Sequence, residues 1–150
     1  MDSDEDHTER DMNDTQRDEF LAAARDAVLA ALPEAWAIYV YGSFARGEEW
    51  PDSDLDLAVL LPPERDIPDL LQAIAAVSRR VGRDVDLVNL RRAGDVLRRE
   101  VLAGGKALHV GNADEVLAWE ASAISRYTRH REEIRGILED FQRTGVAYRS

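Results

Sequence analysis

The chain has 150 residues and a mass of 16.8 kDa, a length that predicts one domain with room for a hydrophobic core. Its 30 acidic residues against 19 basic ones give a net charge of −11, which argues against a general nucleic-acid binder because such proteins carry a basic face. The lack of cysteine excludes disulfides and sulfur-ligated zinc, and no apolar run approaches the roughly 18 residues of a membrane span. We therefore expect a cytoplasmic soluble protein that contacts neither a membrane nor nucleic acid directly.

The N-terminal segment is acidic and almost free of apolar residues. Residues 1–19 contain nine acids and two arginines. Such a composition cannot bury enough surface to offset its ordering entropy, so residues 1–13 are predicted to be a disordered acidic tail and residues 14–150 a single domain. A capping-box pattern at Thr15–Asp18, followed by apolar residues at helical spacing, predicts a first helix over Thr15–Leu32 that ends at Pro33.

The rest of the chain alternates between extended and helical patterns. Runs rich in β-branched and aromatic residues predict strands, and apolar residues three or four apart predict helices. The strands are expected at 35–41, 55–61, 84–90 and 107–110, and the helices at 67–81, 94–102 and 112–143. The apolar stripe of the last helix includes Leu117, Ala121, Ile124, Leu138 and Phe141. This order predicts an α/β fold of the two-layer α+β kind, with a mixed sheet of about four strands flanked by helices and a long C-terminal helix.

A candidate phosphate-binding turn follows the first predicted strand. Gly42 allows the backbone to turn sharply, and the N–H groups of a helix that starts at Ser43 can bind phosphate. Ser43 adds a hydroxyl donor, and Arg46 adds a bidentate cation one turn later. By itself, the same pattern also fits an ordinary turn from a strand into a helix.

Three aspartates accompany the next two predicted strands. Asp54 and Asp56 lie two residues apart, so strand geometry places both carboxylates on one face. Asp86 interrupts an otherwise apolar strand, and a buried carboxylate there needs a metal or another partner. Carboxylate oxygens suit Mg²⁺, which also takes substrate phosphates as ligands. The alternative is a solvated strand edge in an acidic protein, and Asp84 is best interpreted as a solvated turn residue.

The spacing of these features favours the functional interpretation. Ten residues separate Gly42-Ser43 from the Asp-x-Asp pair within the string GSFARGEEWPDSDLDLAVLL. This string, together with the VDLVNL segment that contains Asp86, resembles the minimal nucleotidyltransferases (MNT domains) of the DNA polymerase β superfamily. The Arg-rich stretch LRRAGDVLRREVLAGGKALHV and the C-terminal helix also resemble the MntA-type adenylyltransferase antitoxins of HEPN/MNT (type VII) toxin–antitoxin systems.

The resemblance implies an Mg-dependent nucleotidyltransferase. Asp54, Asp56 and Asp86 are then catalytic residues that hold two Mg²⁺ ions, and Gly42, Ser43 and Arg46 bind the nucleotide, which is ATP. The implied acceptor is a tyrosine hydroxyl of a cognate HEPN-family toxin, an RNase in characterised relatives, which AMP transfer silences. Two alternatives remain open: transfer to a small molecule of the aminoglycoside kind, and a non-catalytic antitoxin that acts by binding alone.

Overall fold

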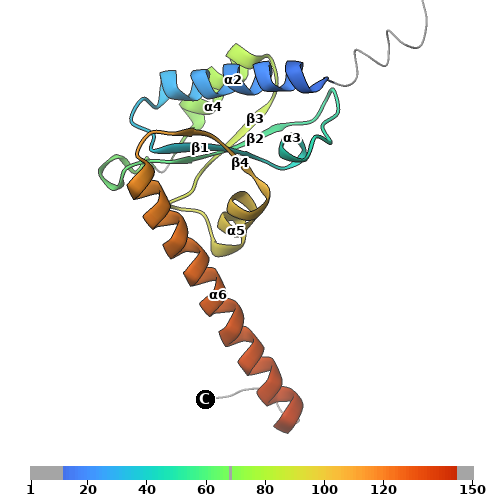
Figure 1. Cartoon of the computed structure of the whole chain (residues 1–150), viewed down its shortest axis with the longest axis vertical. Helices are drawn as coiled ribbons and strands as arrows, with labels where there is room; N and C mark the ends of the chain where they lie inside the picture. The colour runs from blue at the N-terminus through green and yellow to red at the C-terminus, as the bar shows by residue number, and fades with distance from the viewer. Residues whose placement is uncertain (1–11, 68, 145–150) are drawn as a thin grey trace, which may run out of the picture.

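A four-stranded mixed sheet forms the centre of the protein, with helices on both of its faces (Figure 1). The computed structural model describes residues 12–67 and 69–144. The strands are β1 (Ala37–Tyr41), β2 (Leu55–Leu60), β3 (Val85–Asn89) and β4 (Lys106–Val110). They lie in the order β3-β2-β1-β4, with β1 antiparallel to both β2 and β4, and β2 parallel to β3. The predicted mixed sheet of about four strands is confirmed.

Alternating strand residues fill two separate cores. Ile38 and Val40 of β1 face one core, whereas Tyr39 and Tyr41 face the other, because neighbouring side chains of a strand point to opposite faces. The first core is covered by α2 (Asp14–Ala31) and α4 (Leu71–Val81), and the second by α5 (Asp95–Gly104) and the start of α6 (Ala113–Thr144) (Figure 1). The α5–α6 side is a second helical layer that a two-layer description does not include. Two short elements, α3 (Ser43–Arg46) and η1 (Pro63–Arg65), lie in the connections.

The first helix begins earlier than predicted. The Asn13 side chain accepts a hydrogen bond from the Gln16 N–H at 2.7 Å, and the Gln16 side chain accepts one from the Asn13 N–H at 3.0 Å. This capping box, rather than Thr15–Asp18, starts the helix because it satisfies two backbone donors at once. Met12 packs against the first core. Met12 and Asn13 therefore join the folded domain, and the remaining tail, residues 1–11, lies outside the described residues.

The helix predicted at 67–81 begins only at Leu71. Ile67 precedes a proline in the sequence, which disfavours a helical backbone at that position. The Asp69 carboxylate then accepts a hydrogen bond from the Leu71 N–H at 2.9 Å, within the first turn. The other helices and strands agree with their predicted bounds to within two residues at each end.

The long helix α6 leaves the body of the protein after its first turns (Figure 1). Val116 is buried in the second core and Trp119 packs against that core, and Ala123 is buried as well. Leu117 and Ile124 of the predicted apolar stripe are exposed, so this part of the stripe does not pack on the sheet. Within the described part of the chain, no helix is both long and apolar enough to cross a bilayer.

Candidate active site

The turn after β1 has a backbone that favours glycine. Gly42 adopts φ 71° and ψ −148°, and it is the N-cap of α3. A Cβ atom added at this position would stand 2.4 Å from Oδ2 of Asp56. Both observations favour glycine, since other residues rarely adopt positive φ and any side chain would displace the carboxylate. The predicted phosphate-binding turn therefore packs directly against the predicted metal-binding strand.

The strand register places Asp56 and Asp86 on the same face of the sheet. Asp56 pairs with Tyr41 across the antiparallel β1–β2 ladder, and with Asp86 across the parallel β2–β3 ladder. Residues opposite each other in neighbouring strands point to the same face, here the one that α5 and α6 cover. Asp54 lies two residues before Asp56, and the alternation of side chains along an extended chain places both on the same face. The acids thus lie at the end of the sheet where the Gly42-Ser43 turn begins.

Negative charge is concentrated around Asp56. Burial raises the pKa of the Asp56 carboxyl, and the charges of Asp86, Asp54 and Glu100 raise it further, whereas Arg46 opposes them. The pKa of the buried Tyr41 hydroxyl is raised too, by burial first and then by Asp86, Asp56 and Glu100. Both shifts place Glu100 of α5 within electrostatic reach of the strand acids. Glu100 was not predicted, because nothing in the sequence shows that α5 brings it to this end of the sheet.

The three aspartates share one face of the sheet but do not form a complete set of metal ligands. Across residues 12–67 and 69–144, no three acidic or histidine side chains converge in a ready-made metal site. Asp54 is exposed in the loop before β2, and Asp86 is exposed on β3, as expected for like charges that repel one another. The donor chemistry nevertheless fits a hard divalent cation, because oxygen ligands of one charge gather around a partly buried carboxylate.

Arg46 lies at the end of α3, close to this group. Its Nε atom is 2.6 Å from Oε1 of Glu48, in an exposed ion pair. Its charge also lowers the pKa of the Asp56 carboxyl, so it stands near the acids. The structure thus gathers the six predicted site residues at one end of the sheet.

Comparison with known proteins identifies the family. The family described as "Polymerase beta, Nucleotidyltransferase" matches residues 26–114, which include the turn and the three aspartates. The chain belongs to this nucleotidyltransferase family. It is also 32% identical to the protein adenylyltransferase MntA of Shewanella oneidensis over 109 residues, which span 73% of this chain and 78% of that relative.

Solved structures of toxin–antitoxin complexes contain a chain of the same fold. A chain of a toxin–antitoxin crystal structure with AMP-PNP matches with a TM-score of 0.67 and 30% identity, over 81% of this chain and 98% of that one. A chain of the tri-AMPylated Shewanella oneidensis HEPN toxin in complex with its MNT antitoxin matches with a TM-score of 0.59 and 27% identity, over 84% and 95% of the two chains. The predicted minimal nucleotidyltransferase fold is confirmed.

Proposed function

We propose that this protein is an antitoxin that transfers AMP from ATP to a tyrosine hydroxyl of a cognate HEPN-family toxin and so neutralises it. The observation that carries the proposal is the contact between the Gly42 turn and Asp56, on the strand face shared with Asp86. The AMPylated HEPN toxin in the complex of one structural relative supports a protein as the acceptor class. The adenylyltransferase name of the Shewanella relative supports AMP as the transferred group.

In this reaction the acceptor oxygen attacks the α-phosphorus of ATP. The bond from that phosphorus to the oxygen bridging the α- and β-phosphates breaks, and pyrophosphate leaves with the electron pair. Asp54, Asp56 and Asp86 would hold the two Mg²⁺ ions that the reaction requires. When bound, these ions neutralise the charge that develops on the phosphates and leaving group. Asp86 also helps to remove the proton of the attacking hydroxyl.

The residues of the turn bind and orient the nucleotide. Gly42 and Ser43 hold the β- and γ-phosphates, because the turn lets backbone N–H groups and a hydroxyl approach them closely. Arg46 lies near enough to the acids to stabilise the leaving pyrophosphate. A site of this kind works mainly by positioning and charge neutralisation.

The intact mass of the coexpressed toxin tests the proposal. Toxin made with the wild-type chain is expected to gain the mass of one or more AMP groups, and toxin made with the Asp54→Asn/Asp56→Asn variant is expected to gain none. An unmodified toxin that is nevertheless neutralised by the wild type would instead establish inhibition by binding. AMP transfer to an aminoglycoside, with no change in toxin mass, would establish the small-molecule alternative.

Ser43→Ala is expected to weaken ATP binding mildly. The substitution removes one hydroxyl donor but keeps the backbone N–H groups of the turn, so the loss should match one hydrogen bond to a charged group, about tenfold in KM for ATP. Steady-state transfer rates at varied ATP concentration measure this. A kcat that falls by about a hundredfold at saturating ATP would mean that the hydroxyl takes part in the chemical step.

Deletion of residues 1–11 is expected to leave AMP transfer within about threefold of the full chain. The deleted segment is acidic and would repel a triphosphate, and it has no apolar anchor. The shortened chain keeps Met12 and the Asn13 capping box. The same transfer assay measures the rate, and a loss beyond about tenfold would show that the tail positions the toxin or the nucleotide.

A further inference from the structure

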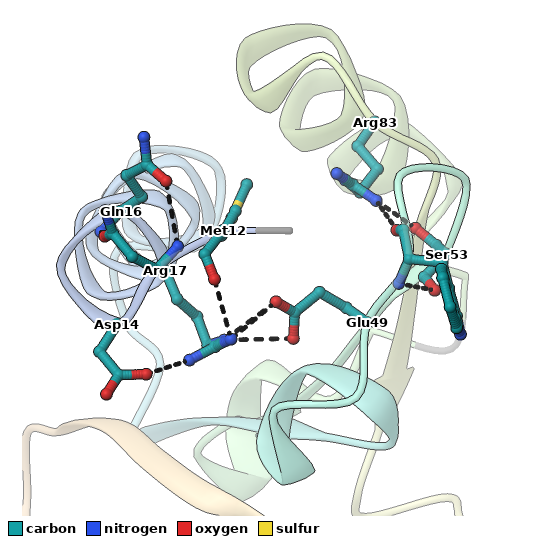
Figure 2. A network of polar contacts seen from close by, with 9 residues as sticks. Met12, Asp14, Gln16, Arg17, Glu49, Ser53 and Arg83 are labelled. Atoms are coloured by element: carbon teal, nitrogen blue, oxygen red, sulfur yellow. Dashed lines mark hydrogen bonds and ion pairs between the residues drawn. The ribbon is translucent and has the colours of Figure 1, made fainter. Parts of the chain in front are cut away.

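The loop between the phosphate-binding turn and Asp54 is irregular but firmly held. Residues 47–54 form no helix or strand, yet they join the end of α3 to the start of β2. Arginines from two other parts of the chain hold this loop at two places (Figure 2). Because Asp54 is its last residue, the position of this carboxylate depends on what fixes the loop.

The first anchor is an ion pair between Arg17 of α2 and Glu49 of the loop. Arg17 Nε donates to both carboxylate oxygens at 3.1 Å, and its Nη2 donates to Oε2 at 2.9 Å. The Glu49 side chain is 3% exposed and that of Arg17 is 16% exposed. Arg17 also donates to the Asp14 carboxylate and the Met12 carbonyl, so its guanidinium is fixed on several sides. The paired N–H groups of the guanidinium fix the orientation of the Glu49 carboxylate as well as its distance.

The second anchor is Arg83, which lies two residues before the start of β3. Its Nη1 donates to the Trp50 carbonyl at 3.0 Å and to the Ser53 carbonyl at 2.8 Å (Figure 2). The guanidinium stands 5.6 Å and 5.1 Å from the ring centres of Phe20 and Phe44, which stack on each other. The contact between the guanidinium and the two rings orients Arg83 toward the loop.

The same region joins the loop to the strand that bears Asp86. The Leu55 N–H donates to the Asp84 carbonyl at 2.9 Å, one residue beyond Asp54. Arg83 therefore acts at the point where the loop, the start of β2 and the start of β3 meet. A shift of Arg83 would move Asp54 relative to Asp56 and Asp86, which sit on the paired strands.

We propose that Arg17 and Arg83 are positioning residues of the transferase reaction, which hold the 47–54 loop so that Asp54 meets the other two aspartates. The inference rests on the proposed function for its catalytic consequence. It predicts that loosening either anchor lowers the rate of the chemical step more than it weakens ATP binding, because Gly42 and Ser43 lie outside the loop.

The test compares Arg83→Lys and Glu49→Gln with Val28→Ala in the full chain. Lysine keeps the charge of Arg83 but cannot present the planar fork, and glutamine keeps the shape of Glu49 but removes its charge. Val28 is a fully buried residue of α2 and belongs to neither anchor, so Val28→Ala controls for a loss of stability alone. If Glu49→Gln does not fold, Arg17→Lys takes its place.

Amide hydrogen exchange in residues 47–54 is the first measurement, and Mn²⁺ affinity is the second. Both anchor variants are expected to exchange at least about tenfold faster in this loop and to bind Mn²⁺ at least about fivefold more weakly. With the toxin as acceptor, kcat is expected to fall at least about tenfold, whereas KM for ATP is expected to rise by no more than the loss in metal affinity, about fivefold. Val28→Ala is expected to leave all of these values within about twofold at temperatures well below its unfolding transition.

Three results would overturn the inference: unchanged exchange in the loop, unchanged Mn²⁺ affinity, or an equal loss of kcat in Val28→Ala. A wild-type protein that transfers no AMP would overturn the proposed function instead. In that case, hydrogen exchange and Mn²⁺ binding would still decide whether the two arginines position Asp54.

Discussion

Asp56→Asn is expected to lower AMP transfer by at least about a hundredfold, because it removes the charge at the centre of the acidic group. Asp56 is the residue in contact with the Gly42 turn and in register with Asp86. Intact-mass analysis of the toxin over a time course measures the rate. Toxin neutralised as well as by the wild type, without a gain of mass, would show that the protein acts by contact.

The same substitution is expected to keep or raise the unfolding temperature in metal-free buffer. Burial and the neighbouring acids raise the pKa of Asp56 in the folded protein, so its charged form destabilises the fold at neutral pH. Asparagine has a similar shape without that charge. Asp52→Asn is the control, since Asp52 is an exposed acid of the 47–54 loop and its substitution should affect neither transfer nor stability. A strongly destabilised Asp56→Asn variant would contradict this account.

Gly42→Ala is expected to abolish most of the transfer activity. The new Cβ would meet the Asp56 carboxylate at 2.4 Å, so either the turn or the carboxylate must move. The backbone of Gly42, with φ 71° and ψ −148°, lies in a region that is essentially restricted to glycine, so alanine there adds a cost of about 1–3 kcal/mol. We expect a loss of transfer of at least about a hundredfold, together with a lower unfolding temperature.

Gly82→Ala separates the backbone cost of the substitution from the displacement of Asp56. Gly82 also has φ 71°, but a Cβ there meets nothing within 4 Å. It ends α4 in the left-handed α region, with ψ 31°, so its substitution should carry a backbone cost of about 1–2 kcal/mol without displacing Asp56. A loss of stability in both variants, larger in Gly42→Ala, with transfer lost only in Gly42→Ala, is the expected result. Equal transfer in the two variants would show that the approach of Gly42 to Asp56 is unimportant.

The sequence predicted those parts of the structure that depend on local patterns. Periodicity located the strands, and motif spacing identified Gly42, Ser43 and the three aspartates as one group. Local patterns could not identify Glu100 or Arg83, because their positions depend on how distant elements pack. The start of the first helix was predicted wrongly because two overlapping segments both resemble caps, and only the hydrogen bonds of Asn13 distinguish them. Local patterns also could not show which face of α6 is buried, because that depends on where the helix separates from the rest of the protein.

The order of the site along the chain has an evolutionary consequence. The proposed phosphate-binding and metal-binding residues all precede residue 90, and the strands that carry them pair directly with one another. The segments after residue 90 add an edge strand and the helices of one face, from which Glu100 approaches the acids. Mutation can therefore change residues after position 90 while the site residues stay the same, as long as the new residues still pair with β1 and cover the second core. Such an arrangement allows the residues that bind nucleotide to be inherited unchanged while that helical face changes.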